Sequence, residues 1–219
     1  MIAFCGDRDI LKYEGVLFSD LYFSWQVLCQ GLDGELSGTT FTVSNDNFVV
    51  SGVEAGGVIY LRNADGTLDG AYEIVSVDSE TVLTISVIRS SSEDLATEPG
   101  DASSVSYRVS TFDPQARQVF LELTQYFGIG PGNGVSEIDA DDIIDTEGLR
   151  IASVYAVIAG VYATLASRED SDNGFWKKSL HYQRLFEKSK ERCRISLDVN
   201  GDGSGDRSAA GGSIKLVRE

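Results

Sequence analysis

The sequence is poor in the residues that build metal centres and disulfide frameworks. It has three cysteines, Cys5, Cys29 and Cys193, and a single histidine, His181, among 219 residues. The cysteines are far apart and odd in number, and no C-x-x-C pair occurs. Structural zinc sites need closely spaced thiolate or imidazole ligands, and disulfide-rich domains need paired cysteines. The sequence therefore predicts neither, and a reducing compartment fits it best.

Long apolar runs and an excess of positive charge are also missing. No stretch approaches the about 18 consecutive apolar residues of a transmembrane helix. Residues 7–9 are charged, where a signal peptide would need its apolar run. The chain carries 34 acidic and 18 basic residues, a net charge of −16, which repels a phosphate backbone. We therefore expect a protein made in the cytoplasm, with no membrane segment and no general affinity for nucleic acid. The simplest interpretation of the excess of acidic residues is that it keeps the protein soluble.

No constellation of catalytic residues can be assembled from the sequence. Nucleophilic catalysis needs a base beside the nucleophile, but His181 lies on a basic helical segment and no G-x-S-x-G motif occurs. The carboxylates of residues 139–145 precede a predicted helix, where they favour the helix dipole. The glycine-rich segment 128–134 follows a helix and lacks the G-K-[ST] ending of a phosphate-binding loop. We expect that the protein is not an enzyme.

Hydrophobic periodicity divides the first half of the chain into a helix and a β module. Apolar residues at helical spacing from Leu17 to Leu28 predict a helix that ends at Gly31 and Gly34. Between residues 36 and 110, five β-branched runs are separated by turn signals and predict a small antiparallel barrel or sandwich. The runs are residues 40–43, 58–61, 72–77, 82–87 and 107–109.

The second half of the chain is predicted to be helical. Asp113, followed by a proline, is a helix start signal, and this helix should end at Gly128. A second helix should begin at Thr146, and a third, basic and amphipathic, should run from Phe175 to about Cys193. Two short strands, 195–197 and 214–217, should flank the final polar loop.

The predicted fold class is α+β: a small helical bundle with an inserted antiparallel β module and an extended C-terminal arm. Because helices flank the β module on both sides, they should share one bundle in space. The expected parts are residues 1–35 as the N-terminal helix of the bundle, 36–110 as the inserted β module, 111–194 as the helical bundle and 195–219 as the arm.

The segment DVNGDGSGD near the C-terminus resembles the first nine positions of an EF-hand calcium loop. Asp198, Asn200, Asp202 and Asp206 stand at positions one, three, five and nine, and position six is a glycine. Position twelve is Ala209, which cannot supply the bidentate carboxylate. These four residues are therefore candidate ligands of at most a weak calcium site. The alternative is a hairpin loop in which the glycines supply positive φ.

Several segments resemble, in their residue pattern, the sequences of one known family. They are LFSDLYFSWQVL, TTFTVSNDNFVV, YRVSTFDPQARQVFLELTQYFGI, YAVIAGVYATLA, FWKKSLHYQRLFEKSKERC and ISLDVNGDGSGD. In their order they resemble the head–tail connector (adaptor) proteins of long-tailed bacteriophages and gene-transfer agents. The resemblance covers most of the chain and includes no catalytic motif. It implies a structural virion protein at the head–tail interface that forms a ring, typically twelve-fold, beneath the portal. It also implies that the ring binds the portal and the next tail or head-completion protein, while DNA passes through without specific binding.

The resemblance gives the C-terminal segment a role, because the family's C-terminal arm commonly docks into the portal. Ile214 and Leu216 alternate with a lysine, as in a strand that adds to the edge of a partner's sheet. They are the candidate partner-contact residues. The rival hypothesis is a calcium-dependent carbohydrate- or surface-binding module, with the β module as the binding unit and the final loop as the ion site.

Overall fold

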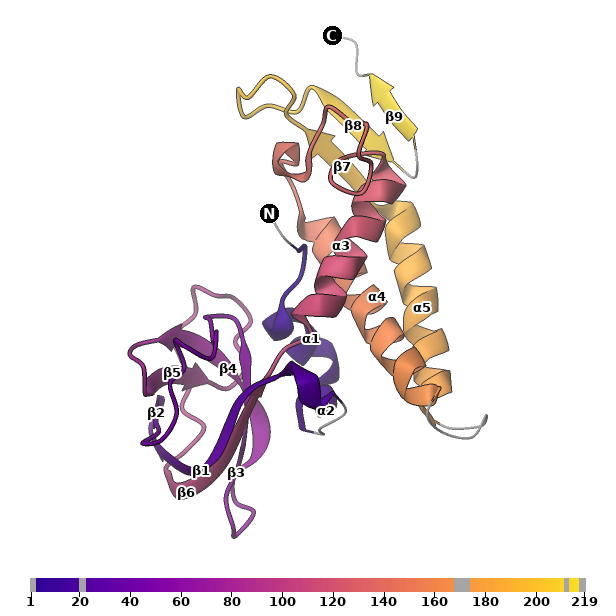
Figure 1. The fold of residues 1–219 in the computed structure, drawn as a ribbon. Helices are drawn as coiled ribbons and strands as arrows, with labels where there is room; N and C mark the ends of the chain where they lie inside the picture. The colour runs from indigo at the N-terminus through magenta and orange to yellow at the C-terminus, as the bar shows by residue number, and fades with distance from the viewer. Residues whose placement is uncertain (1–2, 20–22, 168–173, 211–212, 217–219) are drawn as a thin grey trace. The chain divides into compact units, whose positions relative to one another are not determined.

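The computed structural model describes residues 3–19, 23–167, 174–210 and 213–216, with backbone only for the last four. The chain divides into two compact units, one formed by Gly6–Phe112 and the other by Met1–Cys5 with Asp113–Glu219. The first unit is therefore inserted into the second (Figure 1). Within the described residues the fold is α+β, with five α-helices, a closed six-strand antiparallel barrel and a small three-stranded sheet.

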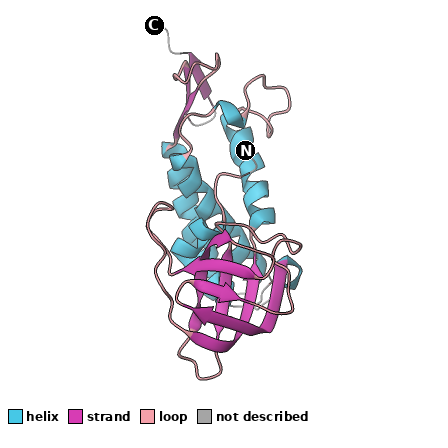
Figure 2. Ribbon diagram, turned by 90° about the vertical axis from the view of Figure 1, so that its left-hand side faces the viewer, coloured by secondary structure: helices cyan, strands magenta, loops and turns pink. Residues whose placement is uncertain are grey.

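The inserted unit is the barrel (Figure 2). Its strands are ordered β1-β2-β5-β4-β3-β6, all neighbours are antiparallel, and β6 closes the barrel against β1. Buried aliphatic and aromatic side chains from every strand fill the interior, including Phe41, Ile59, Ile74, Leu83 and Val109. The elements of this unit are α1 (Asp7–Glu14), α2 (Val16–Ser19), a 3₁₀ turn (Ser24–Gln26), β1 (Val27–Ser37), β2 (Thr40–Thr42), β3 (Val58–Arg62), β4 (Asp69–Val77), β5 (Val82–Ser86) and β6 (Ala102–Ser110).

All five predicted strands are confirmed as β2 to β6, but the helix predicted from Leu17 to Leu28 is wrong. Helix α2 ends at Ser19, and β1 begins at Val27 and contains both glycines that were expected to end the helix. A Cβ at Gly31 would lie 2.6 Å from the Tyr107 ring, and one at Gly34 would lie 2.6 Å from the Phe41 ring. These glycines therefore make room for aromatic rings of neighbouring strands, which sequence periodicity cannot reveal.

The second unit contains the three predicted helices, α3 (Asp113–Phe127), α4 (Glu147–Ala166) and α5 (Gly174–Arg192), which are confirmed. Helix α4 packs against both α3 and α5, and half of its residues are buried. Gly128 ends α3 with a φ of 73°, the left-handed conformation typical of a helix C-cap. By length and composition α4 could cross a membrane, but 56% of the segment is buried, and core helices of soluble proteins pass the same test.

The start of the chain belongs to the helical unit. The ring of Phe4 lies 4.8 Å from that of Phe120, and the Cys5 thiol lies 3.1 Å from the Ser153 hydroxyl. The barrel unit consequently covers residues 6–112, wider than the module expected at 36–110, and the described helices between residues 6 and 35, α1 and α2, belong to it.

The C-terminal segment forms a sheet up to residue 216, where we expected an extended arm. Strands β7 (Arg194–Leu197), β8 (Arg207–Ala210) and β9 (Ser213–Leu216) are antiparallel and lie in the order β7-β8-β9. The two predicted strands are present as β7 and β9, but the middle strand was missed. Strand β7 and the buried Ala209 of β8 contribute to the core of this unit.

Candidate functional sites

The loop proposed as a calcium site is the hairpin connection between β7 and β8. The Asp198 carboxylate accepts backbone N–H groups from Gly201 at 2.7 Å, Asp202 at 3.2 Å and Gly203 at 2.7 Å. These hydrogen bonds, the one from Gly203 foremost, hold the pKa of Asp198 below its usual value. Gly201 and Gly203 have φ of 76° and 83°, so the loop has the backbone that the hairpin interpretation predicts.

The remaining candidate ligands are also bound within the loop. The Asp206 carboxylate accepts the backbone N–H of Val199 at 3.1 Å and the side-chain amide of Asn200 at 3.2 Å. In the described part of the chain, no group of three or more His, Cys, Asp or Glu side chains is placed to hold a metal ion. Calcium binding by Asp198, Asn200, Asp202 and Asp206 stays a prediction.

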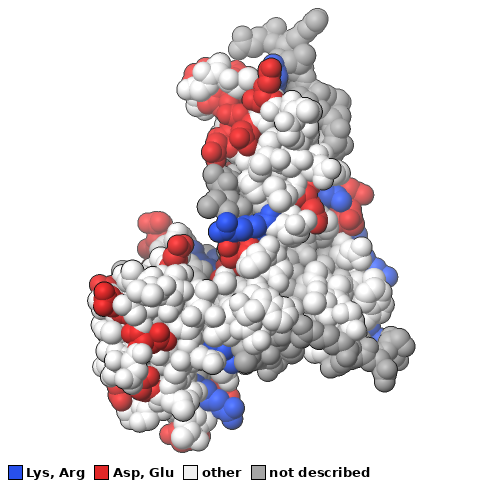
Figure 3. All heavy atoms as spheres, in the orientation of Figure 1, with Lys and Arg blue, Asp and Glu red and all other residues white. Residues whose placement is uncertain are grey.

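The hairpin lies beside a second acidic segment. Ile144 donates its N–H to Ser196 at 3.0 Å, and Asp198 donates its N–H to the carbonyl of Asp142 at 2.8 Å. The segment after α3 and the β7–β8 loop therefore form one acidic end of the helical unit, where Figure 3 shows red side chains gathered. Its acidic residues are Glu137, Asp139, Asp141, Asp142, Asp145, Asp198, Asp202 and Asp206.

The residues considered for catalysis are dispersed or buried. His181 is exposed on α5, with its ring edge-on to Tyr182. All three cysteines are buried thiols outside any disulfide bond of the described residues. Burial, with a smaller effect of Asp46, raises the pKa of Cys29 to about 12, and burial also raises the pKa of Cys193. Because the thiolate is the reactive form, Cys29 and Cys193 have the environment of structural residues.

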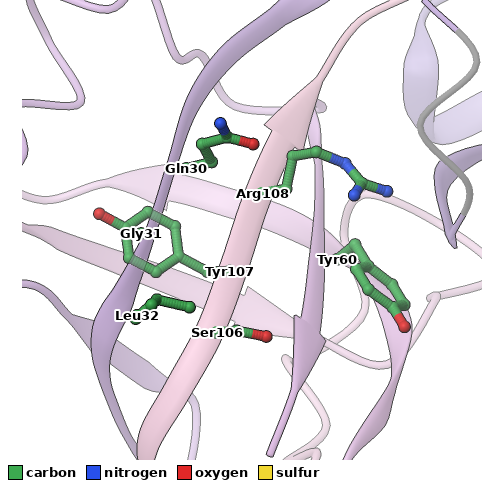
Figure 4. A pocket seen from close by; sticks show the side chains of 7 residues that line it. All are labelled: Gln30, Gly31, Leu32, Tyr60, Ser106, Tyr107 and Arg108. Carbon is green, nitrogen blue, oxygen red and sulfur yellow. The ribbon is translucent and has the colours of Figure 1, made fainter. Parts of the chain in front are cut away.

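A depression on the outer face of the barrel was not predicted from the sequence. It has a volume of about 460 Å³ and lies over β1, β6 and β3 (Figure 4). Tyr60 and Arg108 face each other across β3 and β6, and the guanidinium carbon lies 5.2 Å from the Tyr60 ring centroid. Arg108 also donates to the carbonyls of Phe18 and Ser19 at 2.9 Å. Its guanidinium is thus already used to hold the end of α2 on the barrel.

A groove on the helical unit is the second unpredicted cavity. It has a volume of about 430 Å³, and small residues of α4, including Ala156, Gly160 and Ala163, form its floor. Trp176 and Phe186 of α5 lie on one side, and glutamine and glutamate side chains of α3 lie on the other. The groove exists because α3 and α5 pack mainly on α4 and not on each other.

The candidate partner-contact residues, Ile214 and Leu216, lie on β9, the edge strand of the C-terminal sheet. The backbone of Ile214 is in register with Ala209, and that of Leu216 with Arg207. The side chains of residues 211–219 lie outside the part of the chain that the structure describes. The prediction that these two side chains contact a partner is therefore untested.

Comparison with known proteins gives no match: no family model, curated protein or solved structure is similar to this chain. The resemblance to head–tail connectors stays a proposal.

Proposed function

We propose that this protein is a head–tail connector of a long-tailed bacteriophage or gene-transfer agent. In this role it forms a ring beneath the portal and joins the capsid to the tail. The helical unit would form the body of the ring, with the barrel unit as the inserted β module and the C-terminal strands as the arm. Its partners are further copies of itself, the portal protein and the next tail or head-completion protein.

The observation that supports this function best is the position of β9. It is the last described element and an edge strand, so within its sheet only one side of its backbone is paired, with β8. An unpaired edge is a template for a strand from another chain. A C-terminal segment built as an edge strand therefore suits an arm that docks into a sheet of the portal.

The charge and the two-unit architecture agree with a passive structural role. A net charge of −16 per copy would give a ring an acidic channel along which DNA slides without sticking. The barrel is inserted between Cys5 and Asp113. It is consequently free to vary as a separate contact module for capsid or tail while the helical unit forms the ring.

The test mixes the purified protein with the portal protein encoded by the same genome and images the complexes by negative-stain microscopy. We expect rings on the portal, and we expect a chain truncated after Ala210, or the variant Ile214→Asp/Leu216→Asp, to lose them. The variant Asp198→Ala/Asp202→Ala is the control and should still bind. Wild-type protein that does not bind the portal overturns the proposed function.

One observation favours the rival function, a calcium-dependent carbohydrate- or surface-binding module. The barrel depression places Tyr60 and Arg108 side by side on a concave surface, and aromatic and polar groups together are typical of ligand sites. A calcium titration followed by thermal melting separates the two functions. The rival requires calcium to raise the melting temperature and Asp198→Ala/Asp202→Ala to abolish that shift, whereas a connector requires neither.

A further inference from the structure

We propose that copies of this chain associate head to tail through two oppositely charged surfaces of the helical unit. The first surface, the basic face, is the exposed side of α5 with Arg184, Lys188 and Arg192. The second, the acidic edge, consists of Glu122 on α3 and the segment 137–141 that follows it. This inference rests on the proposed function, because it names the contact by which the ring would form.

Charge is segregated within the helical unit. Residues 174–194, which contain α5, carry seven basic and two acidic side chains. Residues 113–147, which contain α3 and the following loop, carry eight acidic side chains and one basic side chain. A molecule that presents both signs on different surfaces attracts further copies of itself, because complementary potentials steer and orient association.

The two surfaces belong to different helices of one layer. Helix α4 packs against both α3 and α5 (Figure 1). Helices α3 and α5 approach each other where Lys190 Nζ lies 4.8 Å from the Tyr126 ring centroid. Ser179 and Tyr182 are buried on the inner side of α5, while Arg184 and Lys188 are exposed and four residues apart on one face. The basic face thus points away from the core of its own unit.

The acidic edge is fixed to α3 by close backbone packing. Gly132 donates its N–H to the Thr124 hydroxyl at 3.0 Å, and a Cβ at Gly132 would lie 2.2 Å from the carbonyl oxygen of Leu121. The segment that carries Glu137 is therefore held against the same helix as Glu122. A preorganised surface of this kind loses little conformational entropy on association.

Exposed apolar side chains beside the acidic edge could form the centre of an interface. Leu121 on α3 is 43% exposed, and Val135 in the segment after α3 is 91% exposed. Protein interfaces commonly combine apolar anchors of this kind with a charged rim.

The basic face binds the acidic edge of a second copy and not the basic face of that copy. Two basic faces would repel each other, so the contact must join different surfaces and is heterologous. A heterologous contact generates a ring when its rotation closes and an open filament when it does not. The charge distribution therefore predicts an assembly with more than two copies.

The experiment measures self-association of the full chain by sedimentation velocity over a concentration series. We expect Arg184→Glu/Lys188→Glu to weaken association at least about tenfold, because like charges then face each other. Adding Glu122→Arg/Glu137→Lys to that variant should restore association, since the two surfaces are again complementary. The control, Lys12→Glu/Arg62→Glu, makes the same change in net charge on exposed residues of the barrel unit and should associate like the wild type.

Carbodiimide cross-linking of mixed ¹⁴N- and ¹⁵N-labelled chains adds a direct readout. We expect cross-links between copies from Lys188 to Glu122 or Glu137. The inference would be overturned by a wild-type chain that stays monomeric or by compensating substitutions that fail to restore association. It would also be overturned if Arg184→Glu/Lys188→Glu and the control Lys12→Glu/Arg62→Glu weakened association equally. The inference would also be overturned if Arg184→Glu/Lys188→Glu abolished binding of a DNA duplex but left self-association unchanged.

The two proposals can fail separately. If the protein binds the portal as a ring and the α5 reversal has no effect, the function stands and this contact is wrong. If copies associate through the two surfaces but the portal is not bound, the contact stands and the connector function is wrong.

Discussion

Glu73 holds the most buried charge network of the barrel unit and offers the sharpest test of how that unit is stabilised. It lies on β4 with 1% of its side chain exposed, between Arg8 of α1 and Arg89 of the segment after β5. Arg89 Nη2 donates to Glu73 Oε1 at 2.7 Å, and the backbone N–H of Arg89 donates to Oε2 at 3.2 Å. Arg8 Nε lies 2.8 Å from Oε1 without hydrogen-bond geometry, so that contact is ionic.

The network also positions two segments that have no strand pairing of their own. Arg89 Nη1 donates to the carbonyls of Ser92 and Asp94 at 2.9 and 2.6 Å. The backbone N–H of Arg8 donates to the carbonyl of Gly56 at 3.0 Å. Removing the negative charge takes away the carboxylate that the two largely buried guanidinium groups share.

We predict that Glu73→Gln lowers the free energy of unfolding of the barrel unit by about 3–5 kcal/mol, the usual cost of breaking a buried ion pair from one side. For a unit of this size the melting temperature should fall by about 12 °C or more. The measurement is urea denaturation followed by Trp25 fluorescence in a Trp176→Phe background, so that the signal reports on the barrel unit.

The control is Glu80→Gln, the same substitution at an exposed position of the same unit, which should change stability by no more than about 0.5 kcal/mol. Glu73→Leu/Arg89→Met should recover part of the loss, because Arg8 is then the only one of the two guanidinium groups left without the carboxylate. Equal stability of the Glu73→Gln and Glu80→Gln variants would refute the assignment of Glu73 as the centre of the network.

Three further predictions concern single positions. Gly132→Ala should destabilise the helical unit by about 1–3 kcal/mol because its Cβ would overlap backbone atoms of α3, whereas Gly134→Ala, with no neighbour within 4 Å, should not; thermal melting compares them. Burial raises the pKa of Cys29 from 9.0 to about 12, so its contribution to stability is complete below pH 9 and is lost as the pH rises towards 12. Urea denaturation across that range should show a shallower decline for Cys29→Ala, and an identical decline would contradict the prediction. Asp198→Ala should speed amide exchange at residues 201–203 without unfolding the sheet, and unchanged exchange by NMR would rule out its role as the acceptor in the loop.

Elements whose signals are local in sequence were predicted well. The aspartate–proline start of α3 and the glycine that ends it each report on a few adjacent residues. The five barrel strands were recognised because β-branched runs alternate with turn residues. The hairpin geometry of the β7–β8 loop was likewise open to prediction, since its glycines and carboxylates act on neighbouring backbone groups.

Features that depend on distant residues were not predictable. Gly31 and Gly34 gave a helix-stop signal, yet their role is to admit the rings of Tyr107 and Phe41 from other strands. The barrel depression exists because Tyr60 and Arg108 are paired across β3 and β6, and the helix groove exists because α3 and α5 both pack on α4. These contacts between distant residues depend on strand order and helix packing, which cannot be predicted from the hydrophobic periodicity of a single segment.

The distribution of charge argues against acidity as a device for solubility alone. Solubility is served by charges of both signs interspersed over the surface. Here seven of the 18 basic residues fall within residues 174–194, while residues 113–147 carry eight acidic residues and one basic residue. In the proposed assembly, like-charge repulsion within each surface would be relieved where the basic face of one copy meets the acidic edge of the next. The same segregation predicts that self-association weakens as ionic strength rises, because salt screens contacts between exposed charges.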